Sequence, residues 1–80
     1  MDVSHAIITR MNALCAEKGI TVNGLCIRAG VTQSTVHGIV TGRTYSPGIV
    51  TIQRLCDGLD ITIREFFDDS LFDHLDQAIQ

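Results

Sequence analysis

Cysteine and histidine are the residues of this 80-residue sequence whose side chains most often bind metals or react covalently. Its three cysteines, Cys15, Cys26 and Cys56, form no CxxC pair, and their odd number does not suggest a disulfide framework. The three histidines are scattered and belong to no paired zinc-ligand motif. We therefore expect buried free thiols, no metal site and no cofactor.

Aspartate is frequent only near the C-terminus, and its spacing there lacks the alternating ligand positions of an EF-hand loop. We interpret these carboxylates as solvated faces and helix caps. The sequence also contains no glycine-rich phosphate loop and no supported Ser-His-Asp or Cys-His arrangement, and the chain is short for enclosing a substrate pocket. An enzyme is therefore not expected, and no small-molecule substrate is evident.

Charge is distributed unevenly along the chain. Residues 1–56 contain five basic and two acidic side chains, a net charge of +3, whereas residues 57–80 contain one basic and seven acidic side chains, a net charge of −6. The overall charge of −3 taken alone disfavours a nucleic-acid partner, because Lys and Arg neutralise phosphates. The mildly basic body weakens that objection. Apolar runs are far shorter than the roughly 20 residues that cross a bilayer, so we expect a soluble, cytoplasmic protein with no membrane partner.

Apolar periodicity and helix-terminating residues predict an all-α fold forming a single domain over residues 1–80. A first helix is expected from Ser4 to Lys18, followed by a left-handed Gly19. Thr21 is suited to cap a second helix of about two turns that ends at Gly30. The connection to the next helix is then too short for anything but a sharp corner. The expected helices span residues 4–18, 22–29, 33–41, about 47–59, about 63–67 and about 70–79.

The later helices have their own sequence signals. Ser46 and Pro47 form an N-cap followed by the residue best suited to a first helical position, and Ile49 and Val50 are then expected on the buried stripe. Asp60 can end that helix, because Asp tolerates a left-handed backbone. The four residues from Thr62 to Glu65 have the form of a capping box.

The segment from Val22 to Val40 resembles the helix-turn-helix of the lambda-repressor and Cro-like group, also called the XRE family. Cys26 is small enough to permit a close helix crossing, Gly30 lies at the corner, and Val36 has the spacing of an anchor. The resemblance covers roughly residues 5–68 and includes Gly42, Ser46 and Pro47, residues 52–56, residues 59–62 and residues 65–67. It implies a five-helix lambda-repressor-like DNA-binding domain with the helix-turn-helix at about 22–41, to which a C-terminal amphipathic helix at about 70–79 is added.

The function that this resemblance implies is sequence-specific binding of double-stranded DNA by a transcriptional regulator, in particular a repressor on a palindromic operator. The helix at 33–41 would enter the major groove, where Gln33 can pair with adenine N6 and N7. Thr21 and Asn23 would lie at a phosphate, and residues 43–45 would contact the sugar-phosphate backbone. The residues implied at the DNA are Thr21, Asn23, Thr32, Gln33, Ser34, Thr35, His37, Arg43, Thr44 and Tyr45.

The chain departs from the family pattern at three places, and two of these departures, at Val22 and Gly38, together with the acidic charge balance favour an alternative function. Family members often have Gln where this chain has Val22, and Gly38 occupies a position that often carries a base-reading side chain. A buried Arg–Glu pair of the family corresponds to Cys15 and Val40, which we expect to pack together as an apolar replacement. The alternative is a protein-interaction module on the same scaffold, such as an antitoxin or accessory subunit, with weak or no DNA binding.

Apolar residues continue beyond the part of the chain that the resemblance covers. Their helical spacing from Ser70 onward predicts an amphipathic helix, and a symmetric homodimer needs such a self-complementary patch. We therefore expect dimerisation through the C-terminal part. The alternative is that this segment folds back and completes the monomer's own core. The expected dimerisation residues are Phe67, Leu71, Phe72, Leu75 and Ile79.

Overall fold

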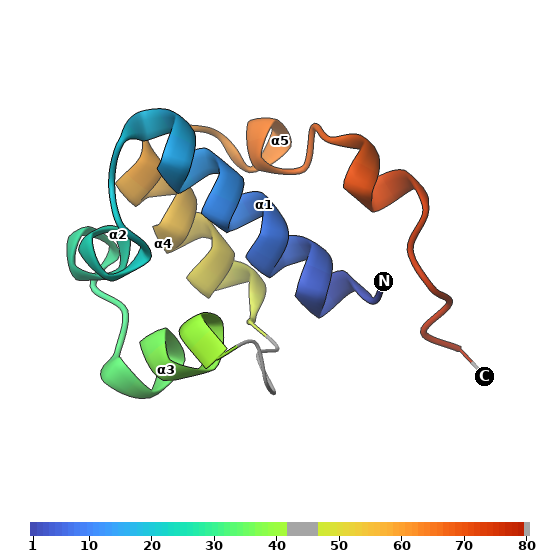
Figure 1. Cartoon of the computed structure of the whole chain (residues 1–80), viewed down its shortest axis with the longest axis horizontal. Coiled ribbons are helices and arrows are strands. Elements are labelled where there is room, and N and C mark those ends of the chain that lie inside the picture. Colours follow the sequence, from blue (N-terminus) through green and yellow to red (C-terminus); the bar gives the residue numbers. More distant parts are fainter. Residues whose placement is uncertain (42–46, 80) are drawn as a thin grey trace.

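The computed structural model describes residues 1–41 and 47–79 and is all-helical over these residues (Figure 1). Helices α1 and α4 lie side by side, α2 packs mainly on α4, and α3 lies at the periphery, below α2 in the view (Figure 1). The short α5 and a following 3₁₀ turn cover the other side of α1 (Figure 1). The elements are α1 (Val3–Lys18), α2 (Val22–Ala29), α3 (Gln33–Thr41), α4 (Ile49–Leu59), α5 (Ile63–Phe66) and the 3₁₀ turn Ser70–Asp73.

The core gathers one apolar stripe from each helix. All three cysteines are free and lie in it, as predicted, and burial raises the pKa of each thiol. Gly58 permits the close approach of α4 to α2, since a Cβ atom there would lie 2.8 Å from Cδ1 of Leu25. The core cluster consists of Ile7, Met11, Leu14, Cys15, Leu25, Cys26, Ile39, Ile52, Leu55, Cys56, Leu59 and Phe66.

Most helix ends follow from local hydrogen bonding. The side chain of Thr21 accepts a hydrogen bond from the Gly24 amide at 2.9 Å and caps α2, as predicted. Gly30 ends α2 in the left-handed conformation with φ of 69°, and Asp60 ends α4 with φ of 59°. The N-cap of α1 is Asp2, which accepts from the His5 amide at 2.9 Å and which the sequence analysis did not identify.

The prediction for the start of α4 was wrong. The helix begins at Ile49, with Gly48 as an N-cap residue in extended conformation, so Pro47 lies outside it and Ser46 lies outside the described residues. Ile49 and Val50 were expected in the buried stripe, but they are 61% and 59% exposed. The buried stripe of α4 starts only at Ile52, and Val50 lies on the opposite side of the helix from it.

The predicted contact between Cys15 and Val40 is also wrong. Cys15 is buried, but Val40 is 67% exposed. The buried residue of α3 is Ile39, with Val36 packed partly against the core. Because successive helical residues are rotated by about 100°, Val40 is carried past the buried side that Ile39 occupies.

The C-terminal segment differs from the predicted amphipathic helix over about 70–79. Only the 3₁₀ turn Ser70–Asp73 forms, and residues 74–79 are not helical. The Asp76 amide donates to the Met1 carbonyl at 3.1 Å instead of to a preceding turn, and the Asp76 carboxylate pairs with the Met1 ammonium at 3.2 Å. Contacts with the distant N-terminus therefore replace the helix.

The five residues predicted to dimerise have different environments within one chain. Phe72 turns toward the core and packs edge-on against Phe67, with ring centroids 4.9 Å apart. Leu71 and Leu75 are half-buried, and Ile79 is 87% exposed. The segment thus folds back at Phe72, as the alternative expected, while it leaves apolar surface uncovered on both sides of that residue.

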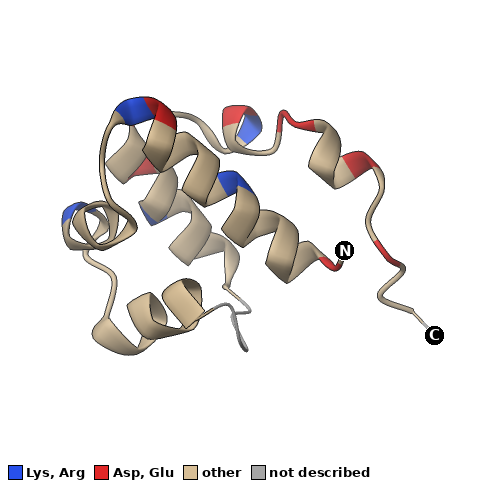
Figure 2. Cartoon of the chain, viewed as in Figure 1, with Lys and Arg blue, Asp and Glu red and all other residues tan. Residues whose placement is uncertain are grey.

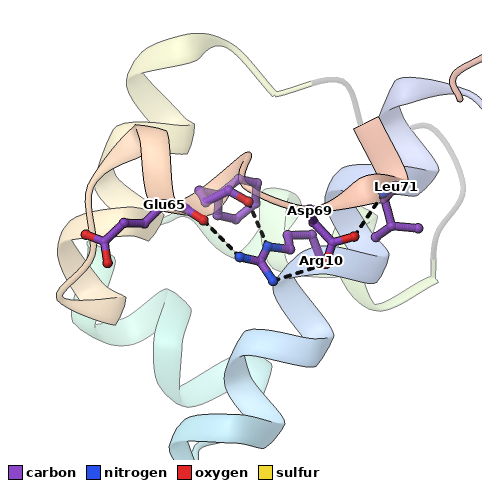
Figure 3. Close-up of polar contacts among 5 residues, drawn as sticks. Arg10, Glu65, Asp69 and Leu71 are labelled. Carbon is purple, nitrogen blue, oxygen red and sulfur yellow. Dashed lines mark hydrogen bonds and ion pairs between the residues drawn. The ribbon is translucent and has the colours of Figure 1, made fainter. Parts of the chain in front are cut away.

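Arg10 fastens α1 to α5 in a way that the sequence analysis did not anticipate (Figure 3). Its Nε donates to the Phe66 carbonyl at 2.7 Å, its Nη2 donates to the Glu65 carbonyl at 2.8 Å, and its Nη1 lies 3.3 Å from Oδ2 of Asp69. Oδ1 of Asp69 in turn accepts from the Leu71 amide at 2.9 Å (Figure 3). One guanidinium therefore satisfies two carbonyls at the end of α5 and orients the start of the C-terminal segment.

The capping box of α5 is present as predicted and carries a testable pH dependence. The Glu65 side chain accepts from the Thr62 amide at 3.1 Å, and the Glu65 amide donates to the Thr62 hydroxyl at 3.1 Å. These contacts, the backbone bond first, lower the pKa of Glu65 below its usual value of 4.5. Because the folded-state pKa is the lower one, this stabilisation is present above about pH 4.5 and is lost as the pH falls through the folded value.

Glu65→Gln is expected to keep the cap and lose this pH dependence, since Gln can accept the same hydrogen bond without titrating. Thermal unfolding of both proteins between pH 7 and pH 3 tests this expectation. The wild type should lose more stability than the variant below about pH 4.5. Parallel curves for the two proteins would exclude the Thr62 contact as a source of acid sensitivity.

Candidate nucleic-acid interface

Helices α2 and α3 form a compact corner whose outer face is α3. Gly30 closes α2 in the left-handed conformation, and its amide donates to the Ile27 carbonyl at 3.3 Å. The Val31 amide then bonds to the Cys26 carbonyl at 3.0 Å, which fixes the exit direction of the chain. Ile39, only 2% exposed, anchors α3 to the core. The opposite side of α3 is therefore left facing solvent (Figure 1).

The predicted DNA-facing side chains on α3 lie on that exposed side. Gln33, Ser34 and His37 are exposed, whereas Thr35 is half-buried. The Thr35 hydroxyl lies 3.1 Å from the Thr32 hydroxyl, which also accepts from the Thr35 amide at a long 3.4 Å. These two threonines hold the first turn of α3, so the free side-chain functions at its start belong to Gln33 and Ser34.

The first turn of α2 presents a second set of polar groups. Thr21 and Asn23 are both exposed. Thr21 accepts the Gly24 amide through its oxygen, which leaves its hydroxyl proton able to donate to an anion. The amides of Val22 and Asn23 belong to the first helical turn and have no acceptor within the helix. Together with the positive end of the helix dipole, these donors suit a phosphate group.

The two sets meet around a shallow depression of about 340 Å³. Asn23 lines it from α2, and four residues of α3 line the rest, namely Gln33, Val36, His37 and Val40. Asn23, Gln33 and His37 were predicted from the sequence to face DNA, whereas the two valines were not. The i, i+4, i+7 spacing of Gln33, His37 and Val40 was the available signal.

Arg43, Thr44 and Tyr45, which were expected to contact the sugar-phosphate backbone, lie outside the described residues.

The charge distribution over this corner differs from that over the rest of the molecule. The sequence from Gly19 to Cys56 contains no Asp or Glu, and α3 contains no charged side chain. Figure 2 shows the acidic residues on α1, on α4 and along α5 and the C-terminal segment, whereas α2 carries Arg28 and α4 carries Arg54. A polyanion therefore meets no carboxylate on α2 or α3, and few cations on them either.

Other kinds of site find little support within residues 1–41 and 47–79. No group of three His, Cys, Asp or Glu side chains in this part of the chain is placed to hold a metal ion. No helix among these residues is long and apolar enough to cross a membrane.

Comparisons with known proteins agree with this geometry. A family model described as a Cro/C1-type helix-turn-helix DNA-binding domain matches residues 10–70. Among solved structures, the crystal structure of the prophage Lp1 protein 11 superposes with a TM-score of 0.81 and 29% sequence identity, covering 94% of this chain and 100% of that chain. No curated protein matches the chain.

Proposed function

Because the chain belongs to the Cro/C1-type helix-turn-helix DNA-binding family, we propose that it is a transcriptional repressor that recognises its operator through α3. The observation that carries this proposal is the exposed polar side of α3, presented on a corner without carboxylates. An α-helix fits the major groove of B-DNA, where each base pair has a distinct pattern of donors and acceptors. Occupation of such a site by the protein then blocks transcription.

The two polar sets have different roles in this proposal. The first turn of α2, with Thr21 and Asn23, binds a phosphate and fixes the position of the domain on the duplex. Gln33, Ser34 and His37 then face the base edges, and Gln33 pairs with adenine N6 and N7. Phosphate contacts give affinity without sequence information, whereas base contacts give discrimination.

Gln33→Ala is expected to lower discrimination at one base position by roughly 1–3 kcal/mol, because one bidentate contact to a base is lost. The preferred duplex is first isolated by selection from a random pool. Dissociation constants are then measured for that duplex and for its single-base variants. The variant protein should bind all four bases at one position nearly equally and keep its preference elsewhere.

Gln77→Ala is the matched control, because Gln77 is an exposed glutamine of the acidic C-terminal segment. It should bind like the wild type. If Gln33→Ala retains full discrimination at every position, α3 does not read bases through this residue. If the wild type selects no duplex from the pool, the chain belongs instead to the protein-interaction modules that Gly38 and the scarcity of cations on α2 and α3 favour.

A symmetric homodimer is part of the proposal, since one short recognition helix makes few base contacts and a palindromic operator doubles them. The apolar surface left by the C-terminal segment supports it: Leu71 and Leu75 are half-buried and Ile79 is 87% exposed. The negative charge of this segment keeps it away from DNA. Its partner in such an interface is the same segment of a second copy.

Replacing both Leu71 and Leu75 by Asp is expected to give a folded monomer, because like charges would then face each other across the two-fold axis. Sedimentation measures the mass, and circular dichroism measures the helix content. Operator affinity should fall by at least about tenfold, since the second half-site contact is lost. A variant that remains a dimer with unchanged affinity would assign the interface to another surface.

A further inference from the structure

Val40 stands out as an apolar side chain on the side of α3 that the proposed function turns toward DNA. This residue is 67% exposed, although α3 also has a buried side where an apolar residue would be expected to lie. It lines the same depression as Gln33 and His37. At helical spacing these three residues fall within about 60° of one another around α3 and form a single ridge.

The chemistry of this ridge changes along its length. Its N-terminal end carries an amide and its middle an imidazole, both able to exchange hydrogen bonds, whereas its C-terminal end carries only the two methyl groups of Val40. The neighbouring Val36 adds further apolar surface to the depression. In the major groove the apolar feature of a base pair is the C5-methyl group of thymine, and a valine side chain offers no hydrogen bond to any base edge.

We infer that Val40 is a specificity-determining residue that packs on the 5-methyl group of a thymine in the operator. The inference rests on the proposed function. It adds a thymine to the bases that α3 recognises, which the hydrogen-bonding side chains of α3 alone would not indicate. The family match indicates duplex DNA as the partner. The depression lined by Val40 is continuous with the polar surface that we assign to DNA.

The inference also fixes a distance along the operator. Gln33 and Val40 are separated by seven residues, which is about 10 Å along a helix axis. Successive base pairs are about 3.4 Å apart along the duplex. For a helix lying along the groove, the thymine read by Val40 is therefore about three base pairs from the adenine read by Gln33.

Replacing thymine by deoxyuridine removes the methyl group and leaves base pairing intact, so it isolates this contact. Each thymine of the selected duplex is replaced in turn, and the dissociation constant is measured with the wild type, with Val40→Ala and with Val3→Ala. Val3 is an exposed valine in the first turn of α1 and serves as the matched control. Thermal unfolding checks that both variants remain folded, which the exposure of both side chains leads us to expect.

One replacement, about three base pairs from the position read by Gln33, is expected to weaken DNA binding by the wild type and by Val3→Ala. The dissociation constant should rise about fourfold, because the contact of one methyl group is lost. Val40→Ala should bind the methylated and the demethylated duplex equally. Equal losses of affinity in the wild type and Val40→Ala, or no loss at any thymine, would overturn the inference. The proposed function would still stand in that case if specificity depends on Gln33. Failure of the wild type to select any duplex would overturn both.

Discussion

Phe66→Ala is expected to lower the free energy of unfolding by about 3–5 kcal/mol, because it removes a large side chain from the core. Phe66 is the largest fully buried side chain among residues 1–41 and 47–79, and it has no exposed surface. Its ring packs edge-on against Phe67 at a centroid distance of 5.1 Å and lies 6.4 Å from Phe72. Truncation removes the ring from the core and leaves a cavity where α5 and the C-terminal segment meet.

Urea-induced unfolding followed by circular dichroism measures this loss. A domain of this size has a total stability on the order of 5–15 kcal/mol, so the variant should be close to unfolded at physiological temperature. Phe66→Leu is the control, because it keeps an apolar side chain and should lose much less. A loss below about 1 kcal/mol for Phe66→Ala would mean that this ring does not fill the core.

Arg10→Met is expected to lower the free energy of unfolding by roughly 2–3 kcal/mol. Methionine keeps an apolar stem but removes the two hydrogen bonds to the carbonyls of Glu65 and Phe66, and each of these bonds contributes about 1–1.5 kcal/mol net. The Arg10 side chain is only 15% exposed, so water does not readily replace these bonds. The corresponding drop in the midpoint of thermal unfolding is about 10–20 °C.

Amide hydrogen exchange distinguishes loss of this contact from a general loss of stability. In Arg10→Met the exchange rates of the Leu71 and Phe72 amides should rise above their wild-type values by more than those of the α4 amides do. The reason is that Arg10 no longer holds Asp69, which fixes the start of the C-terminal segment. Arg54→Met, at an exposed position of α4, should behave like the wild type. Unchanged exchange at Leu71 in Arg10→Met would contradict this role.

The helix ends that sequence predicts well are those set by neighbours in the chain. Thr21 caps the amide three residues later, Thr62 and Glu65 cap each other, and Gly30 reaches a left-handed conformation at little cost. Each of these signals depends on fewer than five consecutive residues. The all-helical fold and the helix-turn-helix therefore follow from sequence, and the family match agrees.

The features that sequence predicts poorly depend on residues far apart in the chain. The contact of Arg10 with the carbonyls of Glu65 and Phe66 spans more than 50 residues and involves backbone oxygens, which leave no trace in residue types. The apolar spacing after Ser70 is compatible with a helix, but the bonds between Asp76 and Met1 and the packing of Phe72 prevail. Tertiary contacts override local propensity in such a segment.

The candidate site shows the same division. The exposure of Gln33, Ser34 and His37 follows from the periodicity of α3, because Ile39 must face the core. Val40 was expected to be buried, because the corresponding position in the family holds one partner of a buried ion pair. In this chain both members of the pair are apolar, and only the small Cys15 is covered. Because Val40 is not covered, its methyl groups are exposed at the C-terminal end of α3.

A nuclear magnetic resonance titration of the isotopically labelled protein with its selected duplex tests most directly the claim that α3 is the surface that contacts DNA. If α3 contacts DNA, the amide resonances of residues 22–24 and 33–41 should shift most, while those of α5 and of residues 69–76 should shift little once any change of oligomeric state is accounted for. A pattern centred on α5 and the C-terminal segment, with α3 unmoved, would contradict the claim.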